Sequence, residues 1–440
     1  MPIPALATLY RDLFSDDETS ALFSGEAEVA AMLAVEAALA EAQGRLGVIP
    51  AEAAAVIADL AHNAEIAPED LAAEAGRHGV PVPGLIAALR ERAAGSDAAQ
   101  YLHWGATSQD IVDTGLSLRL KRLVVIWDGR LAALTATLAH LARAHAELPM
   151  AGRTYGQAAT PTSFGALVAA WGRPLVAYRR RLQALKPDIL RVSLSGAAGT
   201  LSAMGPRGAD VRAALAEALG LIDPGSSWHA ERDGFVSLMQ WMAGVTASLA
   251  KMGEDISLLM QTGIGEVSLA TAGGSSTMPQ KSNPVGPSVI VALARHVAGF
   301  ASVSPAAAIH RLQRDGAAWF SEWLTLPATA ESTGRALVLA NEVATGLAPN
   351  AEAMRRGLDA GYGTIFAEAL TFALAETMPR PEAAAVVGAL CKRAVVEARP
   401  LIDLVAEVFP GRDWSAVLSG GALLGQAPVE ARAFADAVEA

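Results

Sequence analysis

Apolar residues recur every three or four positions through several long stretches of this chain, and this spacing constrains its fold most. The longest run lies between residues 112 and 146 and covers roughly seven helical turns. Its apolar positions are Leu116, Leu120, Leu123, Trp127, Leu131, Leu134, Leu138 and Leu141. The same spacing predicts helices over residues 164–185 and 235–259, and one from Pro284 to about residue 303. Because no segment shows convincing period-two alternation, we predict an all-α bundle of nearly parallel helices.

Helix ends and off-stripe residues predict how the bundle is organised. Near the N-terminus an apolar face through Met32 and Leu39 stops at Gly47 and Pro50. The run Val124–Ile126 lies off the main stripe of its helix, which favours burial on more than one side and hence oligomerisation. Breaks near residues 95, 150, 225 and 362 predict three helical domains. Their predicted ranges are 1–105, 106–355 and 356–440.

Composition narrows the class of protein. The chain has 440 residues, of which 52% are apolar and only 5% aromatic, and its net charge is −11. The acidic balance argues against a nucleic-acid partner. Cys391 is the single cysteine, so no intrachain disulfide can form. With no secretion signal and no charge-free stretch of eighteen residues, we predict a cytoplasmic protein without membrane association.

The segment from Gly273 to Pro284 reads GGSSTMPQKSNP and carries the strongest chemical signal. Glycines let backbone N–H groups converge into an anion-binding nest. Pro284 is well placed to begin a helix, with Asn283 as its cap and Lys281 beside its N-terminus. The segment therefore predicts a site for a carboxylate that gains negative charge during a reaction. The alternative is a flexible Gly/Ser loop followed by a helix cap.

Two further segments combine polar side chains with glycine. In HWGATSQDIVDTG, residues 103–115, Thr107 to Asp110 fits a helix capping box. Capping does not explain His103, which could bind a carboxylate or transfer a proton, although a lone histidine is more often structural. In AGRTYGQAATPTSFG, residues 151–165, Arg153 offers charge and Gln157 a neutral hydrogen bond. The alternative for this second segment is the polar beginning of a helix, with Pro161 in its first turn.

Positive charge gathers in two other segments. SSWHAERDG, residues 226–234, contributes His229 and Arg232, while residues 310–327 contribute Arg311 and Arg314. Arginine binds carboxylates through two parallel hydrogen bonds, which suits a polycarboxylate ligand. The alternative is a set of solvated helix faces with surface salt bridges. The small-residue segment SLSGAAGTLSAMG, residues 193–205, would let a helix or a ligand approach the backbone closely.

Taken together, these motifs resemble the fumarase/aspartase superfamily. GGSSTMPQKSNP matches the pattern GSSxMPxKxNP, residues 152–165 are similar to GRTHxQxAxPxTFG, and residues 195–200 to SGAxGT. The resemblance runs from about residue 27 to residue 327. Within the superfamily, HWGATSQD, WHxxRD and EWLTLP look most like the bacterial 3-carboxy-cis,cis-muconate cycloisomerases. Tyr155 replaces the histidine of many lyases, as in those cycloisomerases, and Gln313 stands where an acidic residue is expected.

The resemblance implies a fold, an assembly and a reaction. The fold would be all-α, in a homotetramer built on a central bundle of twenty helices, with each active site shared by three subunits. The reaction would be the closure of a tricarboxylate diene to a lactone, in the protocatechuate branch of the β-ketoadipate pathway. The alternatives are an adenylosuccinate- or argininosuccinate-type lyase that releases fumarate, a cycloisomerase for a differently substituted muconate, and a catalytically silent scaffold. Neither a metal nor a cofactor is expected.

The resemblance also implies residue roles. Ser275 is expected to transfer the proton, and Lys281 and Asn283 to hold the carboxylate that gains charge, with His103 as a second polar anchor. The remaining residues predicted to bind substrate are Thr107, Ser108, Arg153, Thr154, Gln157, Ser276, Met278, His229, Arg311 and Arg314.

Overall fold

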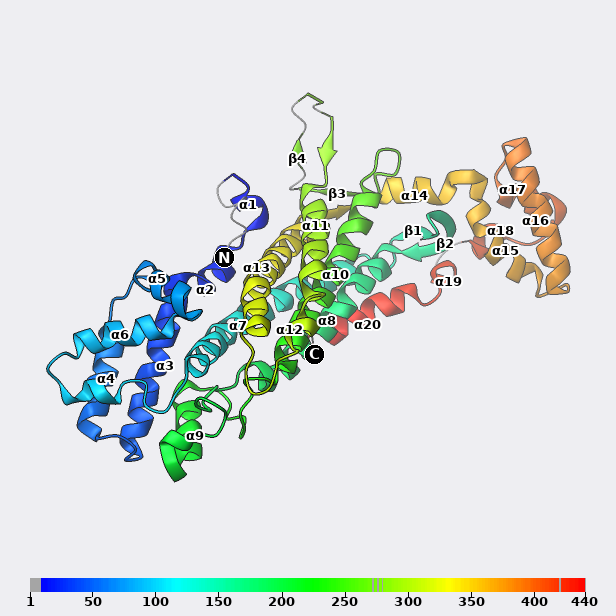
Figure 1. Ribbon diagram of the computed structural model, residues 1–440. Coiled ribbons are helices and arrows are strands. Elements are labelled where there is room, and N and C mark those ends of the chain that lie inside the picture. The colour runs from blue at the N-terminus through cyan, green and yellow to red at the C-terminus, as the bar shows by residue number, and fades with distance from the viewer. Residues whose placement is uncertain (1–8, 271–272, 275–276, 279, 419–420, 440) are drawn as a thin grey trace. The chain divides into compact units, whose positions relative to one another are not determined.

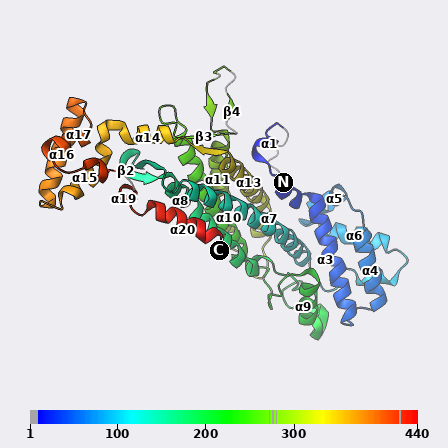
Figure 2. The same ribbon diagram turned by 180° about the vertical axis from the view of Figure 1, so that it is seen from behind.

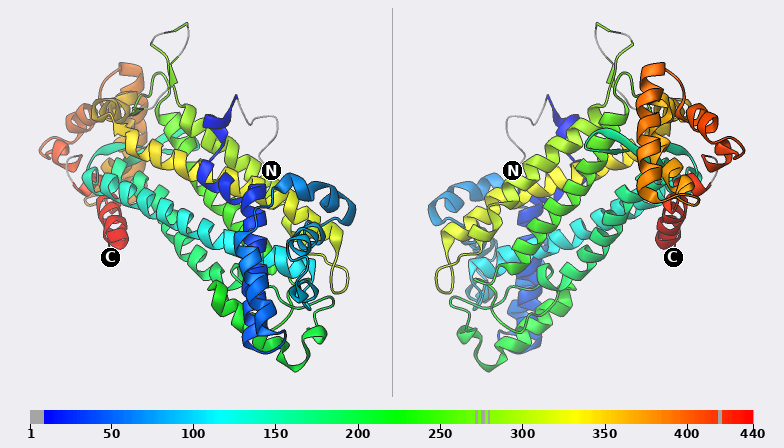
Figure 3. Two further views of the ribbon diagram at one scale, coloured as in Figure 1. Left: turned by 90° about the vertical axis from the view of Figure 1, so that its left-hand side faces the viewer. Right: turned by 90° about the vertical axis from the view of Figure 1, so that its right-hand side faces the viewer.

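The computed structural model describes residues 9–270, 273–274, 277–278, 280–418 and 421–439, and it is mostly helical (Figure 1). Four long helices confirm the sequence prediction: α7 (Ser108–Ala144), α8 (Phe164–Ile189), α10 (Asp233–Leu259) and α11 (Val285–Ala301). A fifth long helix, α13 (Gly316–Gly346), was not predicted from the spacing. Figure 3 shows them from two further sides. The N-terminal apolar face also forms a helix, α3 (Gly25–Arg45).

Contacts between residues divide the chain into two compact units. The first comprises residues up to 129, 178–246 and 292–337, and the second comprises residues 130–177, 247–291 and those from 338 onward. Each of the five long helices contributes residues to both units. The division into domains 1–105, 106–355 and 356–440 therefore stays a prediction.

The first unit packs aromatic side chains between its long helices. Trp127 of α7 stacks on Trp241 of α10 with ring centroids 5.4 Å apart, and Tyr178 of α8 meets Trp241 edge-on. Shorter helices complete this unit: α1 (Arg11–Phe14), α2 (Asp17–Leu22), α4 (Ala51–Asn63), α5 (Pro68–His78), α6 (Val82–Arg92), η1 (Asp97–Tyr101), η2 (Ser202–Arg207), α9 (Gly208–Leu219) and α12 (Ser304–Ala307). Helix α3 packs on both α4 and α9.

The second unit contains an antiparallel hairpin of β1 (Pro149–Thr154) and β2 (Gln157–Ser163). This finding corrects the reading of residues 151–163 as the polar beginning of a helix, since α8 begins only at Phe164. Tyr155 and Gly156 both have positive φ, 51° and 76°, which is the geometry of a type I′ hairpin turn. The strands are rich in small and polar residues, so they show no apolar alternation. Two smaller pairings join β3 (Val267–Leu269) to β6 (Leu347–Pro349), and β4 (Gly273–Gly274) to β5 (Ser282–Asn283).

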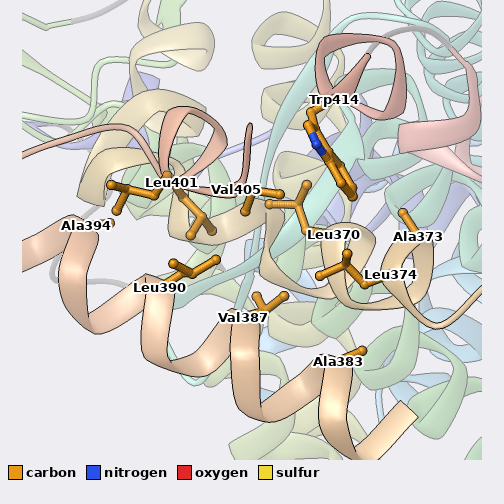
Figure 4. Packing of buried hydrophobic residues seen from close by; sticks show 11 residues of the cluster. Leu370, Ala373, Leu374, Ala383, Val387, Leu390, Ala394, Leu401, Val405 and Trp414 are labelled. Carbon is orange, nitrogen blue, oxygen red and sulfur yellow. The ribbon is translucent and has the colours of Figure 1, made fainter. Parts of the chain in front are cut away.

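The C-terminal part of the second unit forms its own apolar core (Figure 4). The helices of this C-terminal part are α14 (Ala351–Asp359), η3 (Ala360–Phe366), α15 (Ala367–Leu374), α16 (Arg380–Glu397), α17 (Leu401–Val408), α18 (Trp414–Val417), α19 (Gly421–Leu424) and α20 (Ala427–Glu439). Val387 and Leu390 of α16 pack with Leu370 of α15 and Leu401 of α17. Helix α20 packs against α8, as Figure 2 shows from behind. The ring of Phe434 on α20 occupies the place that a side chain at Gly172 of α8 would take.

Among the described residues, Val285–Ala307 is the one helical stretch that is long and apolar enough by composition to cross a membrane. Arg295 and His296 interrupt it. Nδ1 of His296 lies 2.9 Å from the Ser332 hydroxyl of α13, which holds this part of the stretch against another helix of the first unit.

Gly165 sits where α8 meets the end of α7. A Cβ atom at this position would lie 2.4 Å from the carbonyl oxygen of Ala142 and 2.7 Å from Cα of Ala146. Backbone atoms at such distances cannot move aside cheaply. We expect Gly165→Ala to lower the free energy of unfolding by about 1–3 kcal/mol through overpacking, as measured by denaturant titration.

Gly388 provides the matched control. It lies on an exposed face of α16, where a Cβ atom would meet nothing within 4 Å. Gly388→Ala should therefore raise the free energy of unfolding by about 0.5–1 kcal/mol, because glycine is a poor residue inside a helix. Equal effects of the two substitutions would refute the close contact at Gly165.

Candidate active site

Asp110, in the first turn of α7, joins three separate segments of the first unit. Its buried carboxylate accepts hydrogen bonds from the backbone N–H of Thr107 (3.0 Å), Ser195 (2.9 Å) and Gly196 (2.9 Å). A further contact, of 2.7 Å, comes from Nε2 of His229. The bond from Thr107 is one of the two bonds of the predicted capping box, whereas the Thr107 hydroxyl accepts from Arg314 instead of from the Asp110 N–H. One carboxylate thus holds the helix start, the small-residue segment 193–205 and the WHAERD segment together.

Asp113, one turn further along α7, anchors a buried network of charges. It accepts from Nη1 of Arg232 at 2.7 Å and from the indole N–H of Trp319 at 3.0 Å. Arg232 also donates through Nε to Glu322 of α13 at 2.7 Å, and its guanidinium lies 4.7 Å from the ring centre of Trp228. All three charged groups are almost completely buried.

Two carboxylates share the single guanidinium of Arg232, and their titration reflects this. Burial lowers the pKa of Arg232, but the charges and hydrogen bonds of Asp113 and Glu322 outweigh it and raise that pKa. Burial raises the pKa of Glu322 to about 6, against the hydrogen bond and attraction of Arg232, and the negative charge of Asp113 adds to the rise. Glu322 therefore takes up a proton at a higher pH than an ordinary glutamic acid does.

Arg314 is the exposed cation of this region. Its guanidinium donates to the hydroxyl of Thr107 at 2.7 Å and to the carbonyl of Ala197 at 3.1 Å. Within the described part of the chain, no carboxylate pairs with it. An exposed guanidinium held in place by neutral acceptors keeps its charge available to an anionic ligand. Thr107 and Arg314, both predicted to bind substrate, are thus brought together, with Ser108 next in the chain.

His103 lies just upstream in a turn with positive φ (61°). Its Nδ1 is 2.6 Å from a carboxylate oxygen of Glu36 on α3. Burial lowers the pKa of His103, but the charge and the hydrogen bond of Glu36 outweigh it, so that the pKa is raised above its ordinary value. Glu36 therefore favours the charged form of His103, on the same segment as Thr107.

Two other predicted binding residues are placed differently. His229 is buried, and its Nε2 is engaged by Asp110, so it supports the site from the interior. Arg311 points into solvent with 82% of its side chain exposed, and it forms an ion pair with Asp315. Asp315 in turn accepts from the N–H groups of Ala317 and Ala318 at the start of α13. The structure therefore supports the alternative for Arg311, which was a surface salt bridge.

In the second unit, Arg153 is committed to a partner within the protein. Its guanidinium forms two hydrogen bonds of 2.8 Å to Glu266, a carboxylate that is only 1% exposed. This pair braces the β1–β2 hairpin, at whose tip Thr154 and Gln157 form the last paired positions. Tyr155 follows Thr154 and is fully exposed. The hairpin therefore presents Thr154, Tyr155 and Gln157 to solvent.

The GGSSTMPQKSNP segment folds back on itself in the second unit. Gly273 pairs with Asn283 and Gly274 with Ser282, and the Lys281 N–H donates to the Met278 carbonyl at 2.9 Å. Lys281 and Met278 are exposed. Ser275 and Ser276, the predicted catalytic and supporting hydroxyls, lie outside the described residues.

One detail of this segment corrects the sequence analysis. The carbonyl of Pro284 accepts the first helical hydrogen bond from Ser288, and α11 begins at Val285. Pro284 therefore takes the capping position that was predicted for Asn283. Asn283 is held in β5 instead, because its backbone pairs with Gly273.

Sequence reasoning missed Glu36, Asp113 and Glu322. Glu36 interrupts the apolar stripe of α3 directly after Val35, and a carboxylate inside an apolar stripe was the available signal. Asp113 and Glu322 stood inside segments already singled out, but only the fold pairs them through Arg232. No cluster of three or more His, Cys, Asp or Glu side chains suited to a metal ion occurs among the described residues.

Comparison with known proteins shows consistent likeness. Residues 7–299 match the protein family described as "Lyase". The chain is 41% identical to 3-carboxy-cis,cis-muconate cycloisomerase of Pseudomonas aeruginosa, over 88% of this chain and 85% of that protein. The crystal structure of the 3-carboxy-cis,cis-muconate lactonizing enzyme from Pseudomonas putida superimposes with a TM-score of 0.91 at 36% identity, covering 98% and 100% of the two chains. A fumarate lyase from Mesorhizobium sp. BNC1 gives 0.90 at 34% identity, covering 96% and 98%.

The buried network gives a stability test. Arg232→Met leaves Asp113 and Glu322 buried without their cation, so we expect the free energy of unfolding to fall by about 3–5 kcal/mol. Arg179→Met is the control, because it breaks a pair with Asp128 in which both side chains are partly exposed. That change should cost less than about 1 kcal/mol. Denaturant titration of both variants would contradict the network if the two losses were alike.

Glu322 predicts a pH dependence. Its pKa in the folded protein, about 6, lies above its ordinary value of 4.5, so the folded state holds the proton more tightly than the unfolded chain does. The resulting stabilisation is complete below pH 4.5 and is lost as the pH rises through 6. The stability of the wild type relative to Glu322→Gln should thus fall by about 2 kcal/mol between these limits. Urea titrations at several pH values measure it, and a difference that grows with pH would contradict the assignment.

Proposed function

This chain belongs to the lyase family of the fumarase/aspartase superfamily, and from that membership we propose that it is a 3-carboxy-cis,cis-muconate cycloisomerase. The observation that carries the proposal is the likeness, over nearly the whole chain, to two enzymes that are named for this substrate. The exposed cation Arg314 and the neighbouring His103 suit a substrate with several carboxylates.

The reaction would be an internal addition. One carboxylate oxygen of the substrate bonds to a carbon of the diene, and the electron pair of that double bond moves to the adjacent carbon. That carbon is α to a second carboxylate, which takes up the charge until a proton arrives. The product is a five-membered lactone with the same atoms as the substrate plus one proton.

The GGSSTMPQKSNP segment would supply the proton and stabilise the charge. Ser275 is proposed as the proton-transfer group, with its alkoxide stabilised by backbone N–H groups and by Lys281. Lys281 and Asn283 would hold the carboxylate that becomes a dianion, and Ser276 and Met278 would line the substrate. The exposure of Lys281 and Met278 supports a role toward a ligand.

Tyr155 favours the cycloisomerase over a fumarate-releasing lyase. An amine or hydroxide leaving group needs an acid. A carboxylate, which departs when the lactone opens in the reverse reaction, is a much weaker base and can leave without one. The position that many lyases of this superfamily fill with histidine holds a phenol here, at the fully exposed tip of the hairpin. The lyase remains the second candidate because the Mesorhizobium fumarate lyase has nearly the same fold. A differently substituted muconate is the remaining alternative.

A homotetramer with shared sites is proposed for the assembly, in the cytoplasm. Long helices carry apolar side chains that one chain leaves uncovered, among them Val125 on α7, Leu258 on α10 and Leu324 on α13. Only 39% of the apolar window within Val285–Ala307 is buried in the single chain. Faces of this kind are typical of obligate interfaces.

Ultraviolet absorbance of 3-carboxy-cis,cis-muconate tests the function, because the conjugated diene absorbs and the lactone does not. We expect the signal to decay with wild-type protein, Ser275→Ala to abolish the decay, and Lys281→Met to slow it by roughly 10²–10³. Lys392→Met, an exposed change on α16, is the control and should leave the rate unaltered. Stable absorbance together with fumarate release from succinyl adducts would establish the lyase instead.

A further inference from the structure

Two buried polar side chains of helix α3 hold the turn that contains His103. Glu36 and Gln43 are each about 1% exposed and lie seven residues apart, two turns along one face of the helix. The carboxylate of Glu36 lies 2.6 Å from Nδ1 of His103, and the amide of Gln43 donates to the carbonyl of Trp104 at 2.7 Å. A helix that carries no catalytic motif therefore fixes both the ring and the backbone of this turn.

The turn requires such support. His103 has a φ of 61°, a left-handed conformation that is strained for a residue other than glycine. Gly105 also has positive φ, and a Cβ atom there would lie 2.8 Å from the side chain of Met204. The strained turn keeps the imidazole only partly accessible, with 18% of the side chain exposed. One nitrogen faces Glu36, which leaves Nε2 as the nitrogen for a ligand.

The negative charge of Glu36 is compensated by the imidazole ring of His103. Among the described residues, His103 is its sole hydrogen-bond or ion-pair partner. A buried carboxylate without a donor is costly, so the shared proton belongs on Nδ1. From the other elements packed around the ring, Asp110 of α7 also favours the charged form, while Arg90 of α6 opposes it. Burial opposes it as well, so the cation depends on Glu36.

We propose that Glu36 is a positioning residue, which holds His103 as an imidazolium so that Nε2–H binds a carboxylate of the substrate. The inference rests on the proposed function and deepens it. Glu36 touches no substrate atom itself. Its effect is to favour the charged form of His103, which burial alone would disfavour.

The pH dependence of KM separates this role from a merely structural one. In Glu36→Gln the ring loses its proton at lower pH, so KM should rise roughly tenfold or more near pH 7.5, as expected for a lost charge-assisted hydrogen bond. The defect should shrink toward pH 6, where the ring regains its proton, while kcat changes little. Glu36→Asp keeps the charge and should restore part of the affinity.

Two comparisons complete the experiment. Glu41→Gln, on the same helix, breaks an exposed contact with His62 (3.6 Å) and should leave the profile of KM against pH unchanged. In a His103→Gln background, Glu36→Gln should add no further loss, because the two residues act as one unit. Circular dichroism confirms that each variant is folded. A pH-independent change in KM, or full additivity of the two substitutions, would overturn the proposal.

Failure of the inference is distinguishable from failure of the proposed function. Turnover by the wild type with unaltered KM in Glu36→Gln would refute the role of Glu36 alone. Absence of turnover by the wild type would refute the function, and calorimetric binding of propane-1,2,3-tricarboxylate would then replace KM as the readout. The same pH-dependent loss of affinity is expected for Glu36→Gln. Equal affinity of the wild type and the variant, or no binding by either, would overturn the proposal.

Discussion

Two buried carboxylates, one turn apart at the start of α7, are the constraint on which the first unit depends. Asp110 collects donors from three segments, and Asp113 receives the guanidinium of Arg232. Acidic groups near a helix N-terminus are also favoured by the dipole of the helix. Charges at this depth tolerate no missing partner, because an unpaired buried ion costs several kcal/mol. The geometry of the half-buried Thr107 and of the exposed Arg314 follows from this interior.

Much of the fold was predictable because the long helices bury continuous stripes. Their three-four spacing located α7, α8, α10 and α11 to within a few residues. The hairpin at residues 149–163 was not predictable by the same reasoning. Its strands carry small and polar residues without apolar alternation. The hairpin is therefore evident only from the backbone pairing of β1 with β2 and from the positive φ values of Tyr155 and Gly156.

The candidate site was predictable where local sequence decides the geometry. The capping role of Asp110 depends on four consecutive residues, and it was found. Partnerships between residues far apart in the chain could not be read in this way. Arg153 looked like a free cation until the fold supplied Glu266, and His229 looked accessible until the fold buried it against Asp110. The ion-pair partner of a charged residue is decided by the fold, and local sequence does not predict it.

The hairpin tip has a consequence for how this family diversifies. Tyr155 makes no packing contribution that a replacement would forfeit, since its side chain is fully exposed in the single chain. Its left-handed backbone is one that histidine and asparagine adopt more readily than most residues. Exchange between phenol and imidazole at this position therefore costs the scaffold little. A single codon change can therefore replace the side chain at the tip of the hairpin while every helix of the bundle stays as it was.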